Sequence, residues 1–349
     1  METLAVGDRF IAAPLYTQAI AELLGGDFGP IRTIEWSGEK TAQHATQQVM
    51  ETQGPNAVPP PEELLAAVPG AQALCLHFAP VGEKVLAAAD ALRLVAVART
   101  GLENVDVRAA TARGVGVVPV YGRNAGAVAE LQIGLMLTEA RNIARADASV
   151  KAGGWRKEFP GARIEIAGRT VGMVGFGHVG AQFATRLAGF GCELLAYDPY
   201  AGDELLSAHG VTRAPTLEDV FRRADFVVVQ ARHSAETDRF IGAAQLALMS
   251  PDAYLINVSR SRVVDTAALH TALAEGRIAG AGLDVYDEEP LPSDSPWRTL
   301  DNVTLTTHFG GDTEETGRTS TRLVAQILAE YAETGRVRAA VNAEALGWV

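Results

Sequence analysis

Cysteine is scarce in this chain, which has two among its 349 residues. Cys75 and Cys192 each lie in an apolar stretch, ALCLHF and CELLAY, with neither a nearby cysteine partner nor a metal-ligand spacing. A disulfide scaffold and a metal site are therefore not expected. Two buried thiols in a reducing cytoplasm are the simplest interpretation, so we expect a cytoplasmic protein.

Positive charge is also in deficit. The chain has 30 Lys and Arg against 42 Asp and Glu, a formal net charge of -12. A nucleic-acid surface would need a basic patch, so no nucleic-acid partner is expected. Uncharged apolar runs of about 18 residues or more are lacking, and METLAVGDRF at the start contains Glu, Asp and Arg. We therefore expect neither a membrane span nor a secretory signal.

What the chain does have is length and a regular alternation of elements. Its 349 residues suffice for about two domains, and an apolar fraction of 48% permits a sizeable core. Apolar strand-like segments alternate with helical ones from residue 9 to residue 308. This alternation predicts an α/β fold with mostly parallel sheets.

Several segments define the expected organisation. Strands are expected at 9–14 (RFIAAP) and 31–36 (IRTIEW), and the proline run before PEELL should feed a helix. A single long helix from about Ala127 to Lys151 is expected to connect two domains. Residues 314–336 should form an amphipathic helix. Its apolar positions at helical spacing are Leu323, Ile327, Leu328 and Tyr331.

The segment TVGMVGFGHVGAQFATRLAGFGCELLAYD contains Gly175, Gly177 and Gly180 as G-x-G-x-x-G. An apolar strand precedes the glycines and a helix follows them, which is the context of a dinucleotide-binding unit. The first glycine permits a tight turn, the second lets the backbone approach a pyrophosphate, and the third allows close helix packing. The helix N-terminus, at His178 and Val179, would offer N–H groups to the phosphates.

Asp198 predicts which dinucleotide binds. It ends the next strand, where its carboxylate would accept from the adenine-ribose hydroxyls and repel a 2′-phosphate. Pro199 and Tyr200 follow it, without an arginine to bind that phosphate. We therefore expect NAD in preference to NADP. The alternative is a βαβ unit whose glycines serve only the turn.

Polar residues also follow the later strands of this half. Ligands of an open parallel sheet bind beyond the carboxyl ends of its strands. Five residues are expected there: Arg232, Arg260, Asp284, Glu289 and His308. Taken singly, Arg260 could equally be an arginine in a surface ion pair, and Glu289 would more simply be a solvated carboxylate in a loop. An arginine, a glutamate and a histidine that converge beside a dinucleotide form a set with a chemical use.

Four motifs, in order, resemble a known family. The glycine fingerprint, SRSRVVD, LDVYDEEP and TTHFGG resemble the NAD-dependent D-2-hydroxyacid dehydrogenases, which include the phosphoglycerate dehydrogenases, over about residues 74–345. The resemblance implies two Rossmann-like doubly wound domains. Residues 1–122, completed by 312–349, would bind the substrate, and 123–311 would bind NAD. It further implies that the C-terminal helix returns to the first domain, and that the regulatory domain of some phosphoglycerate dehydrogenases is absent.

The family's catalytic set matches Arg260, Glu289 and His308. Oxidation of a 2-hydroxy acid moves hydride to nicotinamide while a base takes the hydroxyl proton. Histidine suits this role because its ordinary pKa, about 6.5, lies near working pH. Glu289 would fix the tautomer of the ring and favour its protonated form, which helps the reductive direction. Arg260 would clamp the carboxylate and polarise the 2-oxo group.

The resemblance also implies binding roles. The loop ARTGLENVD resembles the one that grips the substrate carboxylate through backbone N–H groups, and Asn124 matches a residue of the same cleft. The expected substrate-binding residues are Arg99, Thr100, Gly101 and Asn124. Asp284 matches a residue that contacts the nicotinamide carboxamide. The other expected cofactor contacts in this half are Arg232, Ser259 and Gly310.

The sequence departs from the family pattern at three places. Thr307 stands where a proline usually precedes the catalytic histidine, and the ARTGLENVD loop is about two residues shorter than the commonest form. QARHSAET replaces a typical strand-end His-x-Pro, so Arg232 is either a cofactor or substrate contact or a surface arginine. These departures do not affect the expected reaction type, but they leave open which acid is the substrate.

The expected function is that of an NAD-dependent oxidoreductase that interconverts a D-2-hydroxy acid and its 2-oxo acid. Two alternatives share the fold and the cofactor: an NAD(H)-responsive binding protein, and a dehydrogenase of the formate or phosphite type. Family and long helix together suggest a homodimer. Its other partner would be the small acid itself, with no membrane partner.

Overall fold

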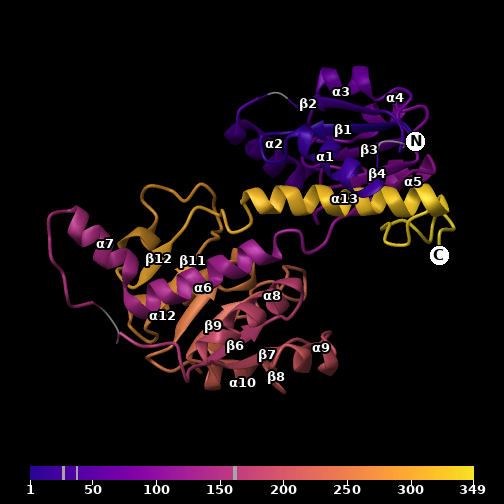
Figure 1. Ribbon diagram of the computed structural model, residues 1–349. Coiled ribbons are helices and arrows are strands. Elements are labelled where there is room, and N and C mark those ends of the chain that lie inside the picture. The colour runs from indigo at the N-terminus through magenta and orange to yellow at the C-terminus, as the bar shows by residue number, and fades with distance from the viewer. Residues whose placement is uncertain (26–27, 37, 160–162) are drawn as a thin grey trace. The chain divides into compact units, whose positions relative to one another are not determined.

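The computed structural model describes residues 1–25, 28–36, 38–159 and 163–349. These residues form two compact units (Figure 1). The first, which we call the terminal unit, consists of Met1–Asn124 and Asp312–Val349, and the second, the central unit, consists of Ala125–Gly311. None of the helices in the described ranges is long and apolar enough to cross a lipid bilayer.

The terminal unit contains a five-stranded parallel sheet in the order β2-β1-β3-β4-β5. The strand order reverses at β1, which pairs with β2 on one side and β3 on the other. The strands are β1 Thr3–Gly7, β2 Ile31–Glu35, β3 Ala73–Leu76, β4 Leu94–Val97 and β5 Gly116–Pro119. The helices are α1 Ala13–Leu24, α2 Lys40–Gln53, η1 Pro55–Ala57, α3 Glu62–Ala67, α4 Glu83–Ala88, α5 Val107–Ala112 and α13 Glu314–Thr334. Strands β3 and β4 are buried throughout, which explains their uninterrupted apolar sequences.

The last helix, α13, completes the terminal unit. It packs against α1 and β4, and Figure 1 shows it running along the sheet of this unit. Leu328 is fully buried, and Leu323, Ile327 and Tyr331 pack against the same core cluster. The expected amphipathic helix and its return to the first unit are therefore confirmed.

The central unit contains a seven-stranded parallel sheet in the order β12-β11-β10-β9-β6-β7-β8. The strands are β6 Thr170–Val174, β7 Glu193–Tyr197, β8 Thr212–Arg213, β9 Phe226–Val229, β10 Tyr254–Asn257, β11 Gly280–Leu283 and β12 Val303–Leu305. The helices are α6 Ala125–Arg141, α7 Ile143–Lys151, α8 His178–Leu187, η2 Ala188–Phe190, α9 Asp203–Ala208, α10 Leu217–Arg223, α11 Ala243–Leu246, η3 Ser261–Val263, α12 Thr266–Ala274 and η4 Pro296–Thr299. The order reverses between β6 and β9, as in a doubly wound nucleotide-binding sheet. The expected α/β class with two Rossmann-like domains is confirmed.

The first strand does not lie where the sequence predicted it. The expected strand at 9–14 is wrong, because β1 occupies Thr3–Gly7 and the chain turns immediately after it. The Asp8 carboxylate accepts hydrogen bonds from the backbone N–H groups of Phe10 and Ile11, which fixes that turn. Pro14 then lies in the first turn of α1, where a proline costs no hydrogen bond.

The expected single helix from about Ala127 to Lys151 is also wrong. It is divided into α6 and α7 at Asn142, whose φ of 55° is left-handed, a conformation that asparagine tolerates better than most residues. Arg145 on α7 forms a buried ion pair of 2.9 Å with Glu139 on α6. This pair fixes α7 in its new direction after the break.

Candidate active site

The glycine turn follows β6 at the point where the strand order reverses. Gly175 has a φ of 96°, and a Cβ on it would lie 2.8 Å from the backbone nitrogen of Ala231. A Cβ on Gly180 would lie 2.7 Å from the ring of Phe176. Gly177, by contrast, has open space within 4 Å of that position. The first and third glycines are therefore required by the protein, and the second leaves backbone accessible to a ligand.

Helix α8 begins directly after this turn, at His178. No side chain caps its first turn, His178 is exposed and Val179 is half-buried. The N–H groups of a helix start have no partner within the helix and carry a partial positive charge. The turn and the helix start together have the chemistry of a pyrophosphate site.

Asp198 lies one residue beyond β7 and is half-buried. Its Oδ2 accepts from the backbone N–H of Phe176 at 2.7 Å. Its Oδ1 accepts from the N–H groups of Tyr200 and Ala201 at 2.7 and 3.0 Å. Asp198 thus holds the glycine turn to the loop after β7. A carboxylate has about four acceptor sites, so Asp198 can accept one further hydrogen bond.

His308 and Glu289 form the closest pair in the candidate site. His308 Nδ1 lies 2.6 Å from Glu289 Oε2, and Glu289 Oε1 accepts from the backbone N–H of Tyr286 at 2.9 Å. The two side chains are 37% and 21% exposed. A carboxylate can only accept, so the ring donates through Nδ1 and leaves Nε2 to exchange protons.

Arg260 belongs to the same electrostatic group. Burial tends to raise the pKa of Glu289, but the hydrogen bond and charge of His308, the Tyr286 N–H and the charge of Arg260 together lower it. The structure thus joins His308 to Glu289 by a hydrogen bond, and the charge of Arg260 acts on the same carboxylate. Arg260 is exposed, and its guanidinium donates to the carbonyl of Ser259 at 2.7 Å.

Asn257 orders the Arg260 loop, a role that sequence reasoning missed. It is 2% exposed at the end of β10. Its Oδ1 accepts from both the N–H and the hydroxyl of Ser259, and its Nδ2 donates to the carbonyl of Arg260. The available signal was a polar residue that directly ends an apolar strand, two positions before a serine.

The strand before His308 is shorter than expected. The sequence VTLTTH predicts a strand that runs to His308, but strand β12 ends at Leu305. Thr306 still donates its N–H to Leu283 on β11, but its hydroxyl donates to Asp284 at 2.6 Å. His308 itself has a left-handed φ of 56°. The chain therefore bends at the histidine, before it reaches Gly310 and Gly311.

Asp284 holds the loop that carries His308. It is 1% exposed, and it accepts from the backbone N–H groups of Phe309 and Gly310 at 3.2 and 2.9 Å. A Cβ on Gly310 would lie 2.7 Å from Val258 and 3.0 Å from Asp284, so only glycine fits there. The nicotinamide contact expected of Asp284 stays a prediction, beside this loop-forming role.

Arg232 lies in the exposed loop after β9. Its carbonyl accepts from the Thr237 hydroxyl at 2.6 Å. Next to it, His233 and Arg262 both pair with Asp238, at 2.8 and 3.0 Å. The backbone of this loop is thus ordered, and the role of the Arg232 side chain stays open.

The expected substrate loop lies in the terminal unit, beyond β4. Arg99 is 8% exposed, pairs with Glu103 at 3.3 Å and lies 5.0 Å over the ring of Phe78. Thr100 donates its hydroxyl to the Val120 carbonyl at 2.9 Å. A Cβ on Gly101 would lie 2.9 Å from the Arg99 guanidinium. Arg99, Thr100 and Gly101 therefore lie together in one ordered loop. Asn124 is half-buried and is the last residue of Met1–Asn124, the first segment of the terminal unit.

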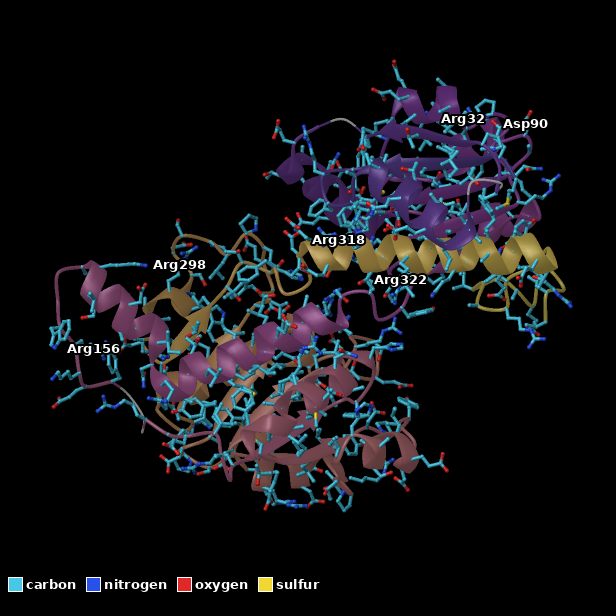
Figure 2. All side chains as sticks on the ribbon, viewed as in Figure 1. Arg32, Asp90, Arg156, Arg298, Arg318 and Arg322 are labelled. Carbon is cyan, nitrogen blue, oxygen red and sulfur yellow. The ribbon has the colours of Figure 1, made fainter. Side chains whose placement is uncertain are left out.

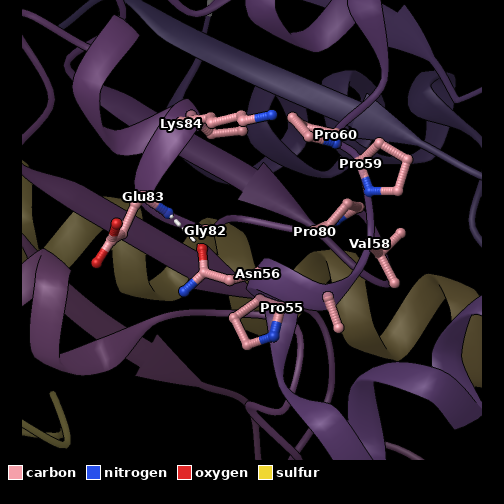
Figure 3. A pocket seen from close by; sticks show the side chains of 11 residues that line it. Pro55, Asn56, Val58, Pro59, Pro60, Pro80, Gly82, Glu83 and Lys84 are labelled. Atoms are coloured by element: carbon pink, nitrogen blue, oxygen red, sulfur yellow. Dashed lines mark hydrogen bonds between the residues drawn. The ribbon is translucent and has the colours of Figure 1, made fainter.

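A cavity of about 500 Å³ occurs elsewhere in the terminal unit (Figure 3). Prolines line much of it, and Asn56 accepts from the backbone N–H of Glu83 at its edge. Its lining includes none of the residues expected to bind substrate or cofactor. The candidate site therefore rests on the strand ends and not on this cavity.

A family model described as "D-isomer specific 2-hydroxyacid dehydrogenase, NAD binding domain" matches residues 133–310. The chain belongs to this family. The chain is 40% identical over 267 residues to a D-3-phosphoglycerate dehydrogenase of Methanocaldococcus jannaschii, and the match covers 76% of this chain and 50% of that one. It is 38% identical over 255 residues to a glyoxylate reductase of Korarchaeum cryptofilum, with 72% and 76% covered. The chain spans about half the length of the phosphoglycerate dehydrogenases it matches.

Solved structures agree on the fold of the chain. The NAD-complexed D-isomer specific 2-hydroxyacid dehydrogenase of Lactobacillus delbrueckii ssp. bulgaricus superposes with a TM-score of 0.77 at 22% identity, over 98% of this chain and 100% of that one. The D-lactate dehydrogenase of Escherichia coli gives 0.69 at 25% identity, over 97% and 98%. The family model and the relatives confirm the expected family and its NAD-binding domain, while the roles of single residues stay predictions.

Proposed function

We propose that this dehydrogenase interconverts a D-2-hydroxy acid and its 2-oxo acid with NAD(H). The observation that supports this most is the 2.6 Å hydrogen bond between His308 and Glu289. It lies within the electrostatic reach of Arg260, just beyond strand ends of an NAD-binding domain. A general acid–base pair and a fixed cation beside a hydride carrier are the groups that this reaction needs.

The proposed reduction assigns one task to each residue. The nicotinamide, when bound, supplies the hydride. His308 donates its Nε2 proton to the developing alkoxide, and Glu289 stabilises the imidazolium before transfer. Arg260 binds the carboxylate and polarises the 2-oxo group. In the terminal unit, the backbone N–H groups of the Arg99–Gly101 loop, with Asn124, hold the carboxylate.

We further propose that the cofactor is NAD in preference to NADP. The N–H groups at Gly177, His178 and Val179 would hold the pyrophosphate, which the open space at Gly177 supports. Asp198 would accept from the ribose hydroxyls through its remaining capacity and repel a 2′-phosphate. The other proposed cofactor contacts are Gly175, Gly180, Arg232, Ser259, Asp284 and Gly310.

The experiment is a panel of acids with NADH as the measured reactant. We expect NADH consumption with at least one of glyoxylate, hydroxypyruvate, pyruvate and longer 2-oxo acids. Background rates with all of them, in a folded sample that binds NADH, would contradict the proposal. NADH production from formate or phosphite would favour the alternative dehydrogenase. A partner captured only with NADH, without turnover, would favour a binding protein.

We also propose a homodimer. Three large apolar side chains near α7 support it, since Ile143, Val150 and Trp155 are 52%, 53% and 76% exposed. Apolar groups of this kind are commonly covered by a partner. Sedimentation should give about twice the 36.8 kDa mass of the chain, and a monomer mass would contradict the proposal.

A further inference from the structure

The segment directly after Glu289 has few backbone donors of its own. It begins with Pro290, Leu291 and Pro292, and the two prolines have no N–H group. The Glu289 side chain needs a precise place, because its two oxygens accept from His308 at 2.6 Å and from the backbone N–H of the residue three positions before it at 2.9 Å. The backbone that presents this carboxylate therefore depends on contacts from elsewhere in the chain.

Arg298, in η4 of the central unit, provides two such contacts (Figure 2). Its Nη2 donates to the Leu291 carbonyl and its Nε donates to the Pro292 carbonyl, each at 2.8 Å. The N–H groups of a guanidinium lie in one rigid plane, so they hold two neighbouring carbonyls in a fixed relation. We call these two hydrogen bonds the Arg298 clamp. They act on the residues that come directly after Glu289 and Pro290.

The turn from which Arg298 projects is itself ordered. Ser295, which is 8% exposed, donates its N–H to the Pro292 carbonyl at 3.1 Å. Its own carbonyl accepts from the N–H of Arg298, also at 3.1 Å. Leu291 and Trp297 pack against the same core cluster of the central unit. The clamp is therefore anchored at both ends to packed structure.

The guanidinium of Arg298 is used for the clamp and not for an ion pair. Within the described ranges of the chain, it forms no ion pair with a carboxylate. Its charge reaches Tyr286, the residue whose N–H holds Glu289. Burial raises the pKa of Tyr286, and the charge of Arg298 acts in the opposite direction. Arg298 thus lies near both sides of the turn that presents Glu289.

Arg32 makes the same kind of contact in the terminal unit and is also labelled in Figure 2. Its Nη1 and Nη2 donate to the carbonyls of Ala67 and Pro69 at 2.7 and 2.9 Å, and its Nε pairs with Glu2 at 2.9 Å. It lies near the start of β2, an edge strand, whereas the proposed substrate loop follows the end of β4. Arg32 is therefore a matched control for the loss of two arginine–carbonyl bonds.

We propose that Arg298 is a positioning residue, which holds Glu289 where its carboxylate accepts from His308. Among the described residues, no hydrogen bond or ion pair joins Arg298 to either of them, so it acts through the backbone of Leu291 and Pro292. This rests on the proposed function, in which Glu289 orients and stabilises the imidazolium. Without the clamp, the carboxylate takes more than one position, and the hydrogen bond to the ring forms in only part of the molecules.

The activity test measures kcat and its pH profile with NADH and the best acid of the panel. Arg298→Gln should lower kcat by about three- to tenfold, a part of the loss expected for Glu289→Gln. The profile should move toward lower pH, while KM and the dissociation constant for NADH stay nearly unchanged. Arg32→Gln should lower the free energy of unfolding but change neither kcat nor its profile. Full kcat with an unchanged profile in Arg298→Gln would overturn the proposal.

A double variant tests whether Arg298 acts through Glu289. Residues that act in one chain of contacts have non-additive effects. Glu289→Gln with Arg298→Gln should therefore have the kcat and the pH profile of Glu289→Gln alone. A further fall in kcat as large as that in the wild-type background would show that Arg298 acts by another route, and the positioning role would be wrong.

A titration without cofactor or acid separates this inference from the proposed function. Burial would raise the pKa of Glu289, but its hydrogen bond to His308 and the neighbouring charges lower it from 4.5. Carbon NMR of the glutamate carboxyl groups follows this titration, and Glu289→Gln identifies the signal. In Arg298→Gln the pKa of Glu289 should rise, because the hydrogen bond is partly lost. In Arg32→Gln it should equal the wild-type value.

Arg298→Lys distinguishes the clamp from the charge. Lysine keeps the positive charge but has no planar pair of N–H groups, so the pKa of Glu289 should rise in this variant too. A rise in Arg298→Gln alone would assign the effect to charge, and unchanged values in both variants would mean that the clamp does not hold Glu289. Either result overturns the proposal. A rise in both variants of a protein that turns over no acid would support the clamp and contradict the proposed reaction.

Discussion

Each unit contains a histidine–carboxylate pair at the carboxyl edge of its parallel sheet, and the two pairs differ in burial. His77 and Asp8 are 3.1 Å apart and 2% exposed. His308 and Glu289 are 2.6 Å apart, with 37% and 21% of their side chains exposed. The same two chemical groups thus differ in their access to solvent. The sealed pair orders a turn, and the half-exposed pair is the one for which we propose proton transfer to a ligand.

The pKa shifts in the two pairs show whether burial or the neighbouring groups dominate at each side chain. Burial lowers the pKa of His77 although Asp8 opposes it. Burial would raise the pKa of Asp8, but the charge and hydrogen bond of His77 and two backbone N–H groups lower it instead. Glu289 follows the pattern of Asp8. At both carboxylates the neighbouring imidazole and the backbone N–H groups outweigh desolvation, so the pKa is lowered, whereas at the sealed imidazole desolvation outweighs the carboxylate.

The largest expected effect is that of His308→Gln on turnover. We expect kcat to fall by about 10²- to 10⁴-fold, the usual contribution of a general acid–base group. The dissociation constant for NADH, measured by fluorescence titration, should stay nearly unchanged. His209→Gln, at a half-buried histidine that contacts Thr185 and has no role in the proposed reaction, is the control and should keep nearly full activity. Undiminished kcat in His308→Gln would remove this residue from the mechanism.

The sealed pair should matter to stability rather than to chemistry. Asp8→Ala leaves His77 and three backbone N–H groups without their acceptor, so we expect a loss of about 3–5 kcal/mol in the free energy of unfolding. Denaturant unfolding measures it. Asp238→Ala, which breaks the exposed pair with His233, is the matched control and should unfold almost as the wild type does. Equal stability of all three proteins would show that burial does not separate the pairs.

Glu289→Gln tests the charge of the half-exposed pair while preserving its shape. We expect kcat for reduction to fall by about 10- to 100-fold, since the imidazolium loses a neighbouring negative charge. The pH profile of kcat should also move toward lower pH. A loss of kcat without any change in the profile would mean that Glu289 only positions the ring.

The smallest expected effect is on how the free energy of unfolding depends on pH, which should differ between the two pairs. The pKa of His77 lies below its ordinary value of 6.5 in the folded protein, so the unfolded chain binds the proton first as pH falls. Stability from this residue is complete above about pH 6.5 and decreases below it, whereas Glu289, whose pKa is lowered from 4.5, loses its contribution only below about pH 4.5. In His77→Gln, the free energy of unfolding should fall less steeply as pH decreases from about 6.5 to about 4.5. An unchanged curve between about pH 6.5 and 4.5 would contradict this.

The parts of this molecule that follow from local rules could be predicted from its sequence. The glycine turn with Asp198 depends on a short segment, and α13 depends on a helical apolar period, so both were placed correctly. The proposed catalytic set required the order of several motifs, because Arg260 and Glu289 taken alone suggest ordinary surface residues. Family resemblance supplied what single positions did not.

The missed features depend on contacts between distant segments. The break at Asn142 is held by an ion pair whose members lie on either side of it, and β12 stops where Asp284 captures the following loop. His77 had no assigned role, because its partner Asp8 lies 69 positions away in the sequence. A shared place directly after apolar strands was the one signal for that pair.

The division of the terminal unit between two stretches of chain has a consequence for biosynthesis. On the ribosome, the central unit emerges as one continuous segment and can fold while α13 is still being made. The sheet of the terminal unit emerges earlier, yet the α13 side chains that complete one of its core clusters arrive last. Until then the nascent chain exposes an uncovered apolar surface, which is the kind of surface that chaperones bind.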